Sequence, residues 1–231
     1  MATSETFAFN LDIGDIIEEA YERCGLECRS GYDYRTARRS LNMLMLEWQN
    51  RGLNLWTVKN TSQTLTAGTS TYALTADKLD IIEGVCRTDA GDTSLQSDLS
   101  MTRISVSTYS QQTNKLTQGR PLQYYVERTP TNLNLVFWPV PDDAKTYVFN
   151  YYYMERIEDA GNAANLNMDV PARYLPCLTA GLAYYVSMKR KESQQIAPML
   201  KQVYDEQWEL ASDGAREKAS LQVSPGGYNI L

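Results

Sequence analysis

Apolar side chains near the start of the chain recur at helical spacing. Within residues 11–27 they fall at three- and four-residue steps, at Ile13, Ile16, Ile17, Ala20, Tyr21 and Cys24. This period predicts an amphipathic helix. Asp12 stands just before the stripe, where a carboxylate can cap the free amides of the first turn, and Gly25 predicts the end of the helix.

A second helix is predicted over residues 34–53, where the apolar stripe ends at Gly52 and consists of Tyr34, Ala37, Leu41, Leu44 and Trp48. Three arginines, Arg35, Arg38 and Arg39, lie off this stripe. They fit a solvated face, or a contact with DNA or a partner. The loop between the two stripes is short, so the helices are expected to form a helical hairpin.

From Trp56 the period changes, and short strands are predicted around turns at 67–70 and 89–92, with a further strand over residues 121–129. A short helix capped by Ser100 is expected within residues 100–115. In residues 133–138 and 146–154, successive side chains alternate between two faces, as in β-strands. Pro139 and Pro141 end the first of these strands, because proline cannot donate a ladder hydrogen bond. The sequence therefore predicts a hairpin, with one face built from Tyr147, Phe149, Tyr151 and Tyr153.

Helical spacing returns after residue 170. One stripe runs through Tyr174, Leu178, Leu182 and Tyr185. A fourth helix is predicted to start between Ser193 and Pro198, lined by Ile196, Met199, Leu200, Val203, Tyr204 and Leu210. The cations of residues 189–191 follow the third helix, where the helix dipole alone accounts for them.

The order of helix pair, strands and helix pair predicts an α+β fold. Its discontinuous helical bundle would use residues 11–54 and 170–220, and an antiparallel β-rich domain would be inserted at 55–169. Residues 221–231 would form a C-terminal arm, because Pro225, Gly226 and Gly227 interrupt any helix.

The net charge of −6 argues against wrapping nucleic acid, which normally needs a basic face. An acidic wall would instead let DNA slide past, because it repels phosphate. The chain has no apolar run long enough to cross a membrane, so no membrane partner is expected. Its N-terminus lacks the features of a secretion signal, which favours a protein made and used without export.

The sequence offers little for catalysis. It contains no histidine, which removes Ser-His-Asp and Cys-His systems, and it matches no phosphate-loop, dinucleotide or zinc pattern. The remaining possibilities are a Cys24–Cys28 metal pair, an Asp89–Asp92 cation site, and acid pairs at 18–19, 142–143 and 155–159. Helix ends, turns and solvated faces explain these acids and thiols more simply. We therefore expect no enzyme activity, no cofactor and no bound metal.

Several segments together resemble one known family in their order and spacing. They read ARRSLNMLMLEWQNRGLNLW, QTLTAGTSTYALTADKLDII, NKLTQGRPLQYYVER, LNLVFWPVPDDAKTYVFNYYYMERIED and VPARYLPCLTAGLAYYVSMKR. The chain is similar, over most of residues 11–220, to the head-to-tail adaptors of short-tailed phages, also called tail tubular protein A or gatekeeper proteins.

That resemblance implies a structural virion protein of the tail and neck, assembled in the host cytoplasm. A ring of about twelve copies would match the portal's symmetry and sit between the portal protein and the tail nozzle. DNA would pass through the ring during packaging retention and ejection, without sequence-specific binding and along an acidic or neutral wall.

The resemblance also assigns expected roles to residues. Subunit or nozzle contacts would come from Tyr124, Tyr125, Trp138, Tyr152 and Tyr153, although core positions explain these rings equally well. The arm would dock on the portal through Leu221, Val223, Tyr228, Ile230 and Leu231. The arginines at 35, 38 and 39 would face the portal or the DNA.

A competing hypothesis is a receptor- or carbohydrate-binding module of a tail fibre, since the β-rich part contains many Tyr and Trp side chains. The helices at both ends and the missing trimer-style repeats speak against it. A ring would support the adaptor, and a trimer would support the fibre module.

Overall fold

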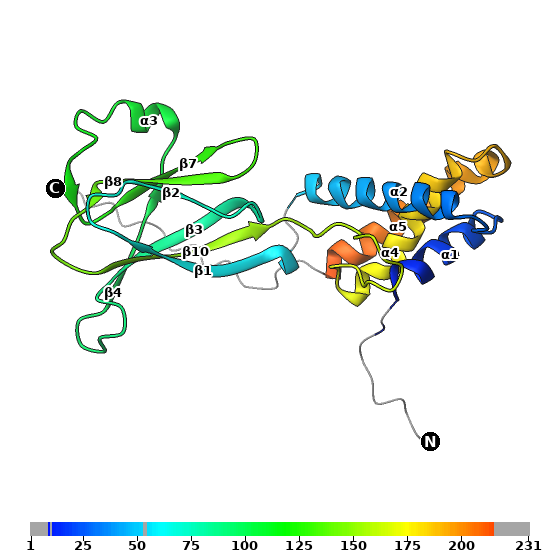
Figure 1. Ribbon diagram of the computed structural model, residues 1–231, viewed down its shortest axis with the longest axis horizontal. Coiled ribbons are helices and arrows are strands. Elements are labelled where there is room, and N and C mark those ends of the chain that lie inside the picture. The colour runs from blue at the N-terminus through cyan, green and yellow to red at the C-terminus, as the bar shows by residue number, and fades with distance from the viewer. Residues whose placement is uncertain (1–8, 10, 53–54, 215–231) are drawn as a thin grey trace, which may run out of the picture. The chain divides into compact units, whose positions relative to one another are not determined.

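A computed structural model describes residue 9, residues 11–52 and residues 55–214 (Figure 1). This part of the chain divides into two compact units. A helical unit combines the described residues up to Ser40 with those from Pro171 onward, and a β-rich unit comprises Leu41–Val170. Helices at both ends and a largely antiparallel middle confirm the predicted α+β class. The domain limits at 54/55 and 169/170 stay predictions, and the arm at 221–231 lies outside the described residues.

The helices have the bounds α1 (Ile13–Arg23), α2 (Gly31–Asn50), α4 (Leu175–Ser187) and α5 (Ala197–Gly214), with 3-10 turns η2 (Ala172–Tyr174) and η3 (Lys191–Ile196). The predicted start and end of α1 are confirmed. The Asp12 carboxylate accepts a hydrogen bond from the Asp15 amide at 2.8 Å, and Gly25 has a positive φ of 67°. The expected stripe of α1 is buried from Ile13 to Cys24.

Helix α4 is the central element of the helical unit and contacts both α1 and α5. Its side chains are buried on nearly every side, at Leu175, Cys177, Leu178, Thr179, Ala180, Gly181, Leu182, Ala183, Val186 and Ser187. A helix that is apolar all round belongs in a core. The single stripe predicted for this segment therefore understates its burial.

The prediction that Met199 and Leu210 line the core of α5 is wrong. Their side chains are 60% and 68% exposed, whereas Leu200, Tyr204 and Ala211 are buried. One position along a helix rotates a side chain by about 100°. Met199 and Leu210 each precede a buried residue, so they are turned away from the buried row.

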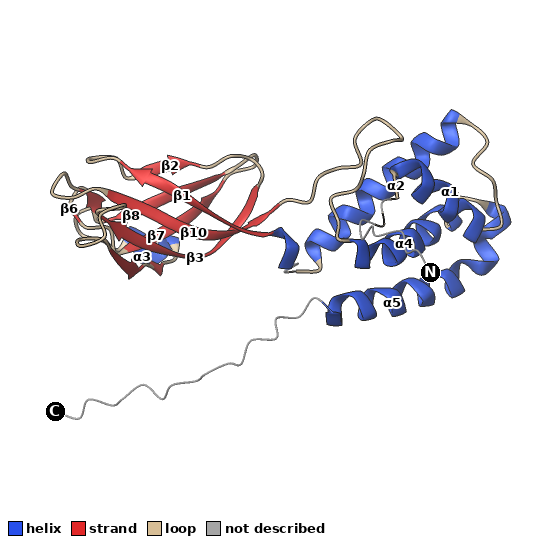
Figure 2. Ribbon diagram, turned by 90° about the horizontal axis from the view of Figure 1, so that it is seen from below, coloured by secondary structure: helices blue, strands red, loops and turns tan. Residues whose placement is uncertain are grey.

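The β-rich unit holds two four-stranded sheets (Figure 2). The first has the order β1 (Val58–Leu65), β10 (Tyr147–Glu155), β3 (Lys78–Thr88) and β4 (Ser97–Ser100). The second has the order β2 (Thr71–Ala73), β8 (Leu133–Trp138), β7 (Gln123–Arg128) and β5 (Thr102–Arg103). A small pair joins β6 (Gln118–Gly119) to β9 (Val140–Pro141), and the short helices are η1 (Leu55–Thr57) and α3 (Val106–Ser110).

Aromatic side chains from both sheets form one core. Phe149 of β10 lies 5.1 Å, between ring centroids, from Phe137 of β8 and 5.1 Å from Tyr124 of β7. Tyr151 stacks on Phe149 at 5.0 Å. The predicted alternation of β10 is confirmed, since its four inward residues are buried and Tyr152 is exposed. The predicted face of Tyr147, Phe149, Tyr151 and Tyr153 thus lies in the interior of a β-sandwich.

The predicted hairpin between residues 133–138 and 146–154 is wrong. β8 pairs with β2 and β7, whereas β10 pairs with β1 and β3 in the other sheet. Both strands therefore have two neighbours already. The chain leaves β8 at Pro139, which cannot donate a ladder hydrogen bond, and crosses to the opposite sheet.

The predicted cap of the short helix is also wrong. Ser100 belongs to β4 and pairs with Val85 of β3. The helix α3 begins later, and the Ser105 hydroxyl accepts a hydrogen bond from the Thr108 amide at 3.2 Å. Two serines near the same segment offered the same capping chemistry, and strand pairing decided between them.

Gly84 of β3 sits against the aromatic core and cannot hold a side chain without a shift. A Cβ atom there would lie 2.4 Å from two ring carbons of Phe149. We expect Gly84→Ala to lower the free energy of unfolding by about 1–3 kcal/mol through overpacking. Urea unfolding followed by circular dichroism measures this.

Gly31→Ala is the matched control, because a Cβ atom at Gly31 meets nothing within 4 Å. It should change stability by less than about 0.5 kcal/mol. Equal effects of the two substitutions would contradict the close approach of Gly84 to Phe149.

Candidate interaction surfaces

Members of the acidic pairs singled out in the sequence hold local structure. Asp142 accepts hydrogen bonds from the Tyr147 hydroxyl at 2.8 Å and the Ala144 amide at 3.1 Å. Glu155 forms an ion pair with Lys59. Within the residues that the structure describes, no three His, Cys, Asp or Glu side chains gather as a metal site.

The Asp89–Asp92 segment is a turn. The Asp89 carboxylate pairs with Lys145 at 2.8 Å, and the Asp92 carboxylate accepts from the amides of Ser94 and Leu95. These bonds occupy the carboxylates that a cation would need.

The Cys24 thiol belongs to the helical core. It is buried and donates to the carbonyl of Ala183 at 3.1 Å, and burial raises its pKa to about 11. The thiol is therefore protonated at neutral pH. Cys28 is half-buried and also free, so the two thiols form no disulfide with each other.

Among the helices of the described residues, none has both the length and the apolar character needed to cross a membrane.

The five aromatic residues proposed for contacts differ in burial. Tyr124 and Tyr153 are buried within the β-rich unit, so the core explanation holds for them in a single copy. Tyr125 and Trp138 are half-buried, and the Trp138 indole donates to the carbonyl of Asn114 at 3.1 Å. Tyr152 is 48% exposed and is the most accessible of the five.

Tyr152 borders a polar hollow on the outer face of the β1-β10-β3-β4 sheet. The hollow has a volume of about 400 Å³ and is lined by Asn60, Glu83, Gly84, Val85, Arg87, Asp98, Ser100, Asn150 and Tyr152. The Arg87 guanidinium holds the Asp98 carboxylate through two hydrogen bonds of 2.8 Å and keeps its pKa below the usual range. The hollow therefore presents fixed polar groups beside one exposed ring.

The three predicted arginines of α2 are exposed or half-buried. Arg35 and Arg39 are exposed and Arg38 is half-buried. Among the ion pairs of the described residues, none includes these three side chains. They are therefore available to a partner, while their predicted assignment to portal or DNA stays a prediction.

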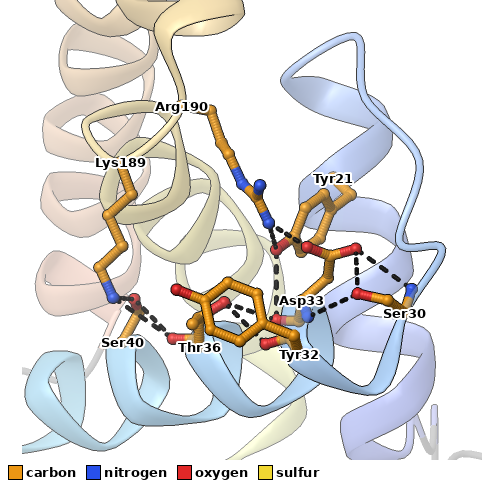
Figure 3. A network of polar contacts seen from close by, with 8 residues as sticks. All are labelled: Tyr21, Ser30, Tyr32, Asp33, Thr36, Ser40, Lys189 and Arg190. Carbon is orange, nitrogen blue, oxygen red and sulfur yellow. Dashed lines mark hydrogen bonds and ion pairs between the residues drawn. The ribbon is translucent and has the colours of Figure 1, made fainter.

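A polar network joins α1, α2 and the segment after α4 (Figure 3). The Asp33 carboxylate accepts from the Ser30 amide at 3.1 Å, from the Ser30 hydroxyl at 2.8 Å, and from Arg190, with which it forms an ion pair. The Tyr21 hydroxyl donates to the Asp33 carbonyl at 3.2 Å. These contacts hold the N-terminal end of α2 against the segment that follows α4.

Lys189 extends this network without an acidic partner among the described residues. Its amine donates to the Ser40 hydroxyl at 2.6 Å and to the Thr36 carbonyl at 3.3 Å. Desolvation and the nearby charge of Arg39 lower its pKa. Sequence reasoning assigned Lys189 and Arg190 to the helix dipole and missed both sets of contacts, for which spacing gave no signal.

The opposite charge gathers on α1. Its carboxylates Asp15, Glu18, Glu19 and Glu22 are all exposed. They border a hollow of about 470 Å³, whose remaining lining residues are Leu11, Arg23, Leu175, Pro176 and Thr179. The helical unit thus carries an acidic groove between α1 and α4 and a row of unpaired arginines on α2.

The described part of the molecule is a β-sandwich inserted into a helical bundle, and its notable features are open charged and aromatic surfaces. Residues 11–226 match the SU10 adaptor protein family, and the chain belongs to that family. It is therefore a phage head-to-tail adaptor, a structural component of the virion. No curated protein sequence matches the chain significantly.

Proposed function

We propose that the chain forms a ring of about twelve copies between the portal and the tail nozzle of a short-tailed phage. DNA would pass through this ring during packaging retention and ejection. The observation that carries the proposal is the match to the adaptor family across residues 11–226. The placement in a short-tailed phage rests on the sequence resemblance.

The charge of the chain fits a conduit that does not hold DNA. The net charge of −6 favours an acidic or neutral channel wall, along which phosphate groups are repelled rather than bound. A continuous basic belt lining the lumen of the ring would contradict this part of the proposal.

Imaging of the chain mixed with its cognate portal tests the placement directly. We expect a ring that caps the portal coaxially and shares its rotational symmetry. Portals that stay bare, or a chain that forms free trimers, would reject the proposal. The same images locate the helical and β-rich units relative to the portal.

The C-terminal arm is proposed to dock on the portal. Deleting residues 224–231 should weaken portal attachment, because Tyr228, Ile230 and Leu231 would bury apolar surface there. Co-sedimentation with the portal measures the loss, and an unchanged thermal unfolding curve shows that the fold is intact.

A full-length variant with Tyr228→Ser, Ile230→Ser and Leu231→Ser separates apolar contacts from chain length. It should weaken attachment as the deletion does. If both variants join portals as well as the original chain, the arm has no docking role.

A carbohydrate-binding role is the second candidate, favoured by the polar hollow beside the exposed ring of Tyr152. An exposed ring with adjacent amide and charged groups suits a sugar. Binding of host-surface polysaccharide that is lost on Tyr152→Ala would support this candidate. Unchanged portal binding by that variant would show that the two roles are separate.

A further inference from the structure

The groove between α1 and α4 combines charge with apolar surface. Among the four carboxylates along its α1 side, only Glu19 has an ion-pair partner in the described residues, Arg23 at 2.8 Å. A second hollow of about 560 Å³ shares Leu11, Leu175 and Pro176 with the acidic one, and its lining also includes Phe9, Ala172 and Arg173. The groove therefore has an acidic rim, formed by the four carboxylates of α1, beside the apolar side chains of Leu11, Leu175 and Pro176.

The exposed row of α2 has the complementary character. Its exposed side chains recur at three- and four-residue steps, at Tyr32, Arg35, Arg39, Met43 and Leu46. Residues at this spacing share one face of a helix. The row thus mixes unpaired cations with exposed apolar side chains.

The lengths of the two charged segments are compatible. At 1.5 Å per residue, Asp15 and Glu22 are about 10 Å apart along α1, and Arg35 and Arg39 are about 6 Å apart along α2. Two guanidinium groups can therefore lie within the span of the acidic rim. An amphipathic helix that lays its exposed face in a groove is a common mode of recognition.

We propose that the exposed row of α2 in one copy docks in the groove between α1 and α4 of the next copy. This inference rests on the proposed ring and names the faces that join its subunits. Such an interface is heterologous, because two different surfaces meet, and successive copies related by one rotation close into a ring.

Charge explains why a second copy is the occupant. Copies with a net charge of −6 repel one another, so an interface between them has to bring opposite charges together. The acidic groove of a neighbouring copy supplies the missing counter-charges.

Charge reversal on each face tests the inference. One variant carries Arg35→Glu and Arg39→Glu, and the other carries Glu18→Arg and Glu22→Arg. Native mass spectrometry and sedimentation at low salt measure self-association, and copy number on cognate portals is counted by imaging. Each variant alone should associate at least about tenfold more weakly than the original chain, because like charges then face each other.

An equimolar mixture of the two variants should recover assembly with alternating subunits, since every junction is again complementary. A control with Lys115→Glu and Lys201→Glu changes the net charge as much as the first variant, at exposed positions outside both faces. It should assemble like the original chain. High salt should weaken all assemblies that form.

Variants that assemble as well as the original chain, or a mixture that fails to recover, would overturn the inference. If the arginine variant loses portal or DNA binding while self-association persists, the row faces that partner instead. Rings that form on portals in spite of the reversals would reject this interface and leave the proposed function standing. Failure of the original chain to form any ring, free or on portals, would reject both.

Discussion

Replacing Phe149 by alanine is expected to lower the free energy of unfolding of the β-rich unit by about 3–5 kcal/mol. The Phe149 side chain is 0% exposed, and its ring lies 5.0–5.1 Å from those of Phe137, Tyr124 and Tyr151. It joins the two sheets, so its removal leaves a cavity at the centre of the sandwich. Urea unfolding measured by fluorescence and circular dichroism would report the loss.

Tyr152→Ala is the matched control for that substitution. Tyr152 lies on the same strand but is 48% exposed on the outer face. Its removal should change stability by less than about 0.5 kcal/mol. A Phe149 variant that is as stable as the Tyr152 variant would contradict the sandwich core described above.

Asp33→Ala is expected to lower the free energy of unfolding of the helical unit by about 1–3 kcal/mol. The substitution removes the acceptor for the Ser30 amide, the Ser30 hydroxyl and Arg190 together. It also leaves the half-buried Arg190 charge without its ion pair. Thermal unfolding should show the loss, and Asp205→Ala, which removes an exposed carboxylate from α5, should show almost none.

The contribution of Asp33 should depend on pH. Hydrogen bonding from Ser30, and then the contact with Arg190, lower the pKa of Asp33. A lowered carboxyl pKa stabilises the fold above the unfolded value of about 3.9, and this stability is lost as the pH falls through the folded pKa. The difference in unfolding free energy between the original chain and Asp33→Asn should therefore shrink on acidification below about pH 4. A constant difference would contradict the assigned role of the carboxylate.

Capping residues, glycines and the spacing of apolar residues predicted the elements that are determined by neighbours in the sequence. The cap at Asp12, the glycine at Gly25 and the apolar stripe between them fix α1 through contacts within a few residues. The alternation of Tyr147 to Tyr153 likewise separated the buried from the exposed face of β10. Both features are set by backbone geometry and side-chain period.

Features that depend on distant partners could not be obtained in this way. β8 and β10 lie close in sequence, and only the pairing with β7, β2, β1 and β3 assigns them to different sheets. Arg190 reaches Asp33 across 157 residues, and Lys189 reaches Ser40 across 149. The periodicity of apolar residues reports only on neighbours along the chain, so it cannot predict such contacts. The unpaired arginines of α2 were visible in the sequence, whereas the groove with its acidic rim required the packing of α1 on α4.

Cryo-electron microscopy of the virion neck tests the central claim most directly. In particles of the phage that encodes this chain, we predict one ring of this protein between portal and tail nozzle, with the portal's rotational symmetry and DNA density along its axis. Density for the chain at the tip of a tail fibre, or in a trimer away from the portal, would contradict the adaptor function proposed here.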